Sequence, residues 1–129
     1  MLELIVTTRD NEEVVDITDG INEIVENNEI KEGLVTLFIT HTTAALTTAD
    51  LDPGTDLDML DAFDELIPKL NFRHAHDPSH TPDHILASMI GPSLAIPFKN
   101  KALVLGTWQR VVLVEFNGPK DRRIIIFVN

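Results

Sequence analysis

The five histidines are the residues of this sequence best suited to carry out chemistry, and all of them lie between positions 41 and 84. A neutral imidazole binds zinc and similar metals, and it also gains and loses a proton near neutral pH. Because the chain has no cysteine, a metal site would need histidine together with aspartate or glutamate. The histidines therefore predict a metal site or an acid–base site. The alternative is a solvated polar loop in which they have no function.

The spacing of the histidines narrows these options only in part. His80 and His84 have the i, i+4 separation of a helical metal pair, but a helix that begins at Pro82 leaves His80 outside it. His41 is predicted to end a strand, beside the hydroxyl groups of Thr42-Thr43. Strand ends commonly present side chains to ligands. The alternative for His41 is a hydrogen-bonded structural residue.

Three further groups of residues are suited to ligand binding. Glu115 lies in a strongly apolar stretch, where its carboxylate needs a partner such as arginine, histidine or a metal. Lys120, Arg122 and Arg123 provide cations for a phosphate group, with simple surface solubility as the alternative. The run Thr107-Trp108-Gln109 contains an indole that would stack on a planar ring or pack in the core or a subunit interface.

Strands and helices that must position these side chains follow from the pattern of apolar and turn residues. Runs rich in β-branched residues predict strands at residues 2–8, 14–17, 34–40, 93–98, 102–106, 109–116 and 122–128. Helices are predicted over residues 21–25 (capped by Thr18 or Asp19), 55–67 and 84–90. Strand 34–40 is apolar in part on both faces and is expected to be central. Helices set within a series of strands predict an α+β fold with a largely antiparallel sheet.

Composition limits the class of protein. The 129 residues, 43% hydrophobic and 24% charged, predict one globular domain over residues 1–129. The formal net charge of −11 argues against nucleic acid as a partner. Residues 66–129 nevertheless hold eight basic and four acidic residues, enough for a local site for an anionic small molecule. No stretch approaches the roughly 20 apolar residues of a membrane span, and the N-terminus lacks the features of a signal peptide. We expect a cytoplasmic protein without membrane contact.

Several short motifs occur together and in one order along the chain. They are His41-Thr42-Thr43-Ala44, Asp52-Pro53, Phe72-Arg73-His74, Asp83-His84-Ile85, Gly91-Pro92-Ser93-Leu94-Ala95-Ile96-Pro97, Leu105-Gly106-Thr107-Trp108-Gln109 and Glu115-Phe116-Asn117-Gly118-Pro119-Lys120. In these motifs the sequence resembles the YjbQ family, which is also described as a secondary thiamine-phosphate synthase type. The resemblance runs from about residue 34 to the C-terminus. Two features depart from it: the stretch before Asp52 is shorter, and His80 stands where many members have asparagine.

The resemblance implies a β-sandwich-like α+β core with two to three helices, assembled as a homotrimer with sites near subunit boundaries. It also implies a weak thiamine-phosphate synthase activity, which joins a hydroxymethylpyrimidine diphosphate to a thiazole phosphate and releases diphosphate. His41, His74 and His84 match the family's histidines and are expected to converge in one pocket, where a divalent metal such as zinc or magnesium is expected. From the same resemblance we expect His41, His84 and Glu115 to be catalytic. The residues expected to bind substrate are Thr42, Thr43, Thr107, Trp108, Gln109 and Arg122.

Two alternatives to an enzyme stay open. The first is a trimeric protein that binds a metal or a phosphorylated metabolite without turnover. The second is a trimeric scaffold whose histidines are structural. The metal itself is a point of tension, since magnesium suits a diphosphate but prefers oxygen ligands, whereas three imidazoles suit zinc.

Overall fold

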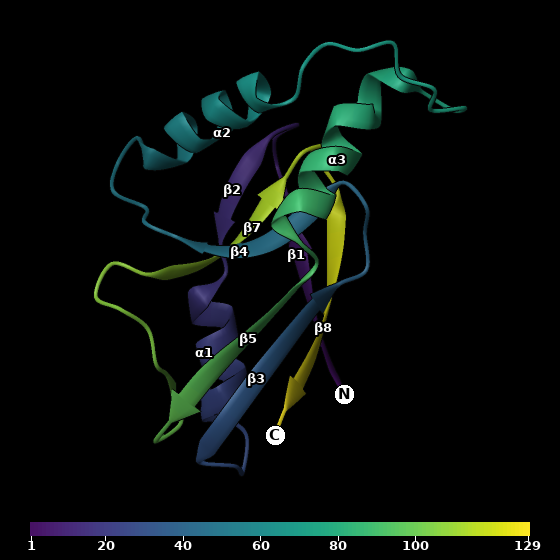
Figure 1. The fold of residues 1–129 in the computed structure, drawn as a ribbon. Helices are drawn as coiled ribbons and strands as arrows, with labels where there is room; N and C mark the ends of the chain where they lie inside the picture. Colours follow the sequence, from purple (N-terminus) through teal and green to yellow (C-terminus); the bar gives the residue numbers. More distant parts are fainter.

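Two antiparallel sheets and three helices make up the computed structural model, which describes all 129 residues (Figure 1). In chain order the elements are β1 (Leu2–Thr7), β2 (Glu13–Asp16), α1 (Thr18–Glu26), β3 (Glu32–Ile39), β4 (Ala44–Ala49), α2 (Thr55–Leu66), the 3₁₀ turn η1 (Pro78–His80), α3 (Thr81–Ile90), β5 (Ser93–Lys99), β6 (Ala102–Leu103), β7 (Arg110–Glu115) and β8 (Asp121–Val128). One sheet has the order β1-β8-β3-β5-β6 and the other β2-β7-β4. The predicted α+β class with antiparallel pairing is confirmed.

The main core lies between the five-stranded sheet, the three-stranded sheet and α1. Strand β3 contributes Val35, Leu37 and Ile39, which alternate with exposed or half-buried residues as a strand with one buried face requires. Helix α1 adds Ile21 and Val25, one turn apart and both fully buried. A strand apolar along its length is typical of a central position, and β3 does lie between β8 and β5.

A second, smaller core lies on the other face of the three-stranded sheet, under α2 and α3 (Figure 1). Strand β7 serves both cores, because its successive side chains Val111 and Val112 enter opposite clusters. This double burial explains its unbroken apolar sequence. None of the three helices is long and apolar enough to cross a membrane.

Four elements differ from the sequence predictions. Strand β4 was not predicted, because its sequence of alanine, leucine and threonine has a weak strand signal. Strand β6 has two residues and not the five predicted. In α2 no residue is buried, and Leu57 and Leu66 of its predicted apolar face are 61% and 54% exposed. Helix α3 begins at Thr81, three residues early, because η1 runs directly into it.

The predicted turns occur where expected. The hairpin between β5 and β6 has positive φ angles at Asn100 and Lys101, as a tight type I′ turn requires. The turn Asn117-Gly118-Pro119 joins β7 to β8, and these strands belong to different sheets. The chain therefore passes from the three-stranded sheet to the five-stranded sheet at this turn, and residues of the turn and the start of β8 line the candidate site.

Candidate functional site

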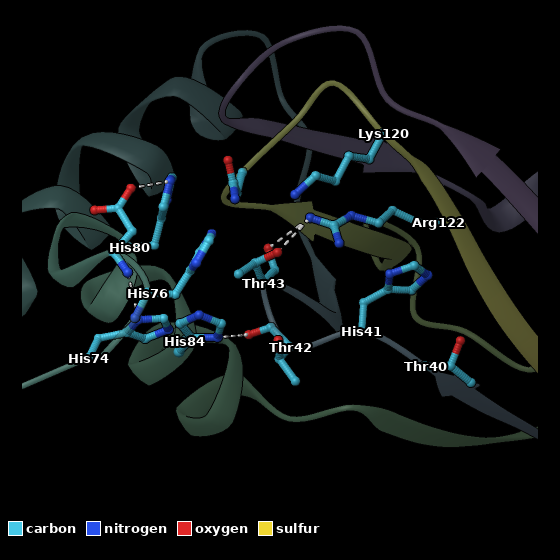
Figure 2. Close-up of a pocket in the computed structure, with 12 residues that line it drawn as sticks. Thr40, His41, Thr42, Thr43, His74, His76, His80, His84, Lys120 and Arg122 are labelled. Carbon is cyan, nitrogen blue, oxygen red and sulfur yellow. Dashed lines mark hydrogen bonds and ion pairs between the residues drawn. The ribbon is translucent and has the colours of Figure 1, made fainter.

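A polar pocket of about 530 Å³ lies where three loops meet, and all five histidines line it. His41 lies at one end, away from the other four (Figure 2). None of its twelve lining residues is hydrophobic. They come from the β3–β4 connection, the segment before and within α3, the β7–β8 turn and the start of β8: Thr40, His41, Thr42, Thr43, His74, His76, Asp77, His80, His84, Asn117, Lys120 and Arg122. The prediction that His41, His74 and His84 share one pocket is confirmed.

His74 and His84 form a stacked pair at one end of the pocket. Their ring centroids are 5.0 Å apart and the rings are inclined by 15°. Nδ1 of His84 donates to the carbonyl oxygen of Thr42 over 3.2 Å, while Nδ1 of His74 accepts from the backbone N–H groups of His76 (3.2 Å) and Asp77 (2.9 Å). Each ring is thus held in one orientation by the backbone.

His41 lies at the opposite end of the pocket, near Lys120 and Arg122 (Figure 2). Its Nε2 accepts a hydrogen bond from the backbone N–H of Arg123, with the two nitrogens 2.9 Å apart. Burial, and then the positive charges of Arg122 and Lys120, lower the pKa of His41 below its usual value, although Glu115 acts in the opposite sense. The lowered pKa favours the neutral form of His41.

Arg122 forms the floor of this end and is almost completely buried, at 1% exposure. Its Nε lies 2.9 Å from Oε1 of Glu115, its Nη2 also contacts Oε2 of Glu115, and Nη2 donates to the hydroxyl of Thr43 over 2.9 Å. The third nitrogen, Nη1, has no hydrogen-bond partner in the protein. Arg122 is thus fixed in place with one terminal nitrogen left for a ligand.

Glu115 is fully buried and does not line the pocket. Burial by itself raises the pKa of Glu115, but hydrogen bonds from Arg122 and Thr8 outweigh it and hold the pKa below its usual range. The sequence assigned Glu115 a catalytic role. The structure places it behind Arg122, where its charge is compensated as predicted and where it positions the guanidinium.

His80 is bracketed by carboxylates. Its Nε2 lies 3.2 Å from Asp77 and its Nδ1 lies 3.0 Å from Asp83. His80 belongs to η1 and precedes α3, so it lies outside the helix, as expected from Pro82, and forms no helical pair with His84.

Three predicted substrate-binding residues lie outside this pocket. Thr107, Trp108 and Gln109 line a separate hollow of about 450 Å³ at the beginning of β7, whereas the histidine pocket lies at its end. Gln109 is committed there, because it accepts from the Gly106 N–H (3.0 Å) and donates to Thr48 (3.1 Å). Trp108 is 73% exposed, so it is not a core residue. Thr42, Thr43 and Arg122, the other three, do line the histidine pocket.

No group of three or more histidine, aspartate or glutamate side chains is arranged to hold a metal ion. His41 is separated from the stacked pair by Thr42 and Thr43 (Figure 2). The metal site of His41, His74 and His84 therefore stays a prediction.

Sequence reasoning missed Thr40, Asp77 and Asn117 as pocket residues. Asp77 had a local signal, since an aspartate before Pro78 and Ser79 is typical of a turn cap, and its carboxylate does accept from the Ser79 N–H over 3.0 Å. Asn117 had none, because its proximity to the histidines depends on how the two sheets meet, and Thr40 was passed over although it directly precedes His41.

Fold and pocket together define a small α+β protein with a polar, histidine-lined site. The chain belongs to the YjbQ family: the model of the "UPF0047 protein YjbQ-like" family matches residues 2–129. A UPF0047 protein of Archaeoglobus fulgidus is 35% identical over 97% of this chain and 98% of its own length. The UPF0047 protein YugU of Bacillus subtilis is 33% identical over 94% of this chain and 92% of its own.

Solved structures agree with the fold. A protein of the YjbQ/UPF0047 family from Clostridium acetobutylicum, described as an uncharacterized conserved protein, superposes with a TM-score of 0.90 at 33% identity and full coverage of both chains. A protein of unknown function from Sulfolobus solfataricus has a TM-score of 0.88 at 33% identity, covering 96% of this chain and 91% of that one. These relatives establish the family and the fold, and none of their descriptions names an activity.

Proposed function

We propose that the histidine pocket binds a phosphorylated small molecule and catalyses a group transfer of the thiamine-phosphate synthase type. The observation that carries the proposal is the position of Arg122, whose guanidinium is buried, oriented by Glu115 and Thr43, and left with Nη1 unpartnered at the pocket wall. Lys120 lies beside it, and its ammonium group has no ion-pair partner in the protein. Two cations and the Thr43 hydroxyl are suited to phosphate oxygens.

In the proposed reaction, the carbon–oxygen bond of a hydroxymethylpyrimidine diphosphate breaks and diphosphate leaves with the bonding electrons. A carbon–nitrogen bond forms to the ring nitrogen of a thiazole phosphate. Negative charge grows on the departing diphosphate, and fixed cations stabilise such charge without reorganisation. Arg122 and Lys120 are assigned this role, and the imidazoles of His41 and His74 line the same pocket.

A divalent metal, zinc or magnesium, is the expected cofactor of this chemistry, but the donor set does not fit one. Asp77 is the one carboxylate among the lining residues, and it already interacts with Ser79 and His80. Magnesium prefers a shell of oxygen ligands, and zinc needs three or four ligands around one point. We therefore assign no step of the reaction to a metal.

We further propose that the chain assembles as a homotrimer through the outer face of the five-stranded sheet, with the cytoplasm as its expected compartment. No helix covers this face (Figure 1), and Leu34, Phe38 and Phe127 on β3 and β8 are about half exposed, at 47%, 47% and 50%. Exposed apolar patches of this kind mark interaction sites. Analytical ultracentrifugation of the wild-type chain tests the assembly, and a monomer at micromolar concentration would reject it.

The activity is tested by incubating the purified protein with the two phosphorylated substrates and measuring thiamine phosphate. Lys120→Ala should raise KM about tenfold, because one charge-assisted contact is lost, and His41→Ala should abolish turnover while the oligomer persists. Lys99→Ala is the matched control, since Lys99 is exposed on β5 and does not line the pocket. Full activity of a folded His41→Ala protein contradicts the proposal.

A second candidate is a binding protein without turnover, and one observation favours it. The pocket has no hydrophobic lining residue against which a pyrimidine or thiazole ring would pack, whereas small-molecule sites are usually lined by apolar side chains. A thermal-shift series with inorganic phosphate and diphosphate, combined with the turnover assay, separates the two. Stabilisation by these anions without formation of thiamine phosphate supports the binding protein.

A further inference from the structure

Backbone contacts fix which nitrogen of each imidazole carries the proton. A neutral imidazole has one N–H and one lone pair, so a fixed partner on one nitrogen determines what the other presents. Three of the pocket histidines have such partners in the backbone, and the partners differ in kind. The three rings are consequently not equivalent toward a ligand.

For His41 and His74 the fixed partner is a donor. The Arg123 N–H points at Nε2 of His41 over 2.9 Å, and a backbone N–H can only donate. Nε2 of His41 therefore holds the lone pair, and Nδ1–H remains for the pocket. In His74 two backbone N–H groups, of His76 and Asp77, donate to Nδ1, so Nε2–H remains. The lowered pKa of His41 agrees with a neutral ring in this state.

For His84 the fixed partner is an acceptor. Nδ1 lies 3.2 Å from the Thr42 carbonyl oxygen, which can only accept, so Nδ1 carries the proton. Nε2 of His84 therefore presents its lone pair. A histidine whose Nδ1–H is held by a backbone carbonyl is a common arrangement for a base or a ligand, because the contact fixes the tautomer and raises the basicity of the other nitrogen.

We propose that the pocket is an anion site with one base: N–H groups of His41 and His74 join Lys120 and Arg122 in binding phosphate oxygens, and Nε2 of His84 accepts a proton from the bound ligand. The proton moves from an O–H or N–H of the ligand to Nε2, which gives an imidazolium still bonded to the Thr42 carbonyl. The ligand class is therefore a phosphate ester that also carries a protic group. The inference rests on the proposed function only in taking the ligand to be phosphorylated.

The protonation pattern of an anion site with one base differs from the pattern that a three-histidine metal site needs. A metal on His41 or His74 would need the nitrogen that carries the proton, and freeing its lone pair would break the hydrogen bonds from Arg123 or from His76 and Asp77. His84 can offer its lone pair with its backbone contact intact. Zinc affinity should therefore depend on His84 and not on the other two.

The tautomers are measured directly by two-bond proton–nitrogen correlation spectra of the ¹⁵N-labelled full chain at pH 7.5, with each ring assigned from its leucine variant. The proposal expects the proton on Nδ1 of His41, on Nε2 of His74 and on Nδ1 of His84. A proton on Nε2 of His84, or on Nε2 of His41, overturns it. This readout does not depend on turnover, so failure of the transferase assay leaves it intact.

Binding of inorganic phosphate and of zinc, followed by titration calorimetry, supplies the second test. His41→Leu and His74→Leu should each weaken phosphate binding by about three- to tenfold. His74→Gln should bind phosphate as the wild-type chain does, because its amide reproduces a donor at the ε position. His84→Leu should change phosphate binding by less than about twofold. For zinc, His84→Leu should show the loss and the other two should not. Equal loss of zinc affinity in all three leucine variants overturns the proposal.

Discussion

Replacing Glu115 with glutamine should destabilise the protein more than any comparable change at the surface. The substitution keeps the shape of the side chain and removes its charge, which leaves Arg122 as an uncompensated cation at 1% exposure. It also weakens the contacts of the carboxylate with Thr8 (2.7 Å) and with Arg122 Nε (2.9 Å). Removing one partner of a buried ion pair costs about 3–5 kcal/mol. That is a large part of the roughly 5–15 kcal/mol by which a domain is stable.

The measurement is urea unfolding at pH 7 followed by circular dichroism, with the free energy taken by linear extrapolation. Glu3→Gln is the matched control, because Glu3 pairs with Arg123 and both side chains are 44% exposed. A surface pair of this kind contributes about 0–1 kcal/mol. The double variant Glu115→Gln/Arg122→Met should regain most of the lost stability, since it removes both buried charges.

The reasoning is refuted if Glu115→Gln costs less than about 1 kcal/mol, or no more than Glu3→Gln. It is also refuted if the double variant is less stable than Glu115→Gln alone, because the isolated cation would then not be the source of the loss.

Three further predictions concern other parts of the fold. Burial and a hydrogen bond with Asp64 raise the pKa of Glu12 from 4.5 to about 7, so its contribution to stability is present below pH 4.5 and lost as the pH rises through about 7. Glu12→Gln should therefore reduce the dependence of the urea unfolding midpoint on pH over this range, and an unchanged dependence contradicts the assignment. Gly118→Ala should lower Tm, because a Cβ there overlaps the Asp10 carbonyl oxygen. Gly106→Ala should not, because the nearest atom to its new Cβ would be 3.6 Å away, and equal effects of the two variants on Tm would be evidence against this packing. Trp108→Ala should change stability by less than about 0.5 kcal/mol in thermal melting, as the side chain is 73% exposed, and a larger loss would place the indole in a contact that stabilises the fold.

The predicted strands and turns were those encoded by local sequence. The apolar run of β3 predicted its central place, and Asn100 predicted the tight hairpin, because apolar composition and turn residues can be read from the local sequence. Strand β4 was missed because its burial is imposed by β7 and α3 and not by its own alanines and threonines. The exposed leucines of α2 show the same effect in reverse, since helical spacing alone does not create a surface to pack against.

The sequence predicted which histidines share the pocket better than it predicted the contacts that each side chain makes. Histidines were identified from their type and from the family motifs, and their convergence is confirmed. The position of Glu115 behind Arg122 follows from the crossing of β7 into β8 between two sheets, which no spacing reveals. The hydrogen bonds that distinguish His41 from His84 come from backbone groups 82 and 42 residues distant in the chain, so they become visible only in three dimensions.

A cavity without hydrophobic lining has a thermodynamic consequence. A ligand that enters it exchanges hydration water for charged and hydrogen-bonding groups and buries little apolar area, so the heat-capacity change of binding should be close to zero. Selectivity in such a cavity arises from the number and direction of polar groups. The affinity of the pocket for its ligand should weaken as the ionic strength rises, because mobile ions screen the charges of Arg122 and Lys120 that attract the ligand.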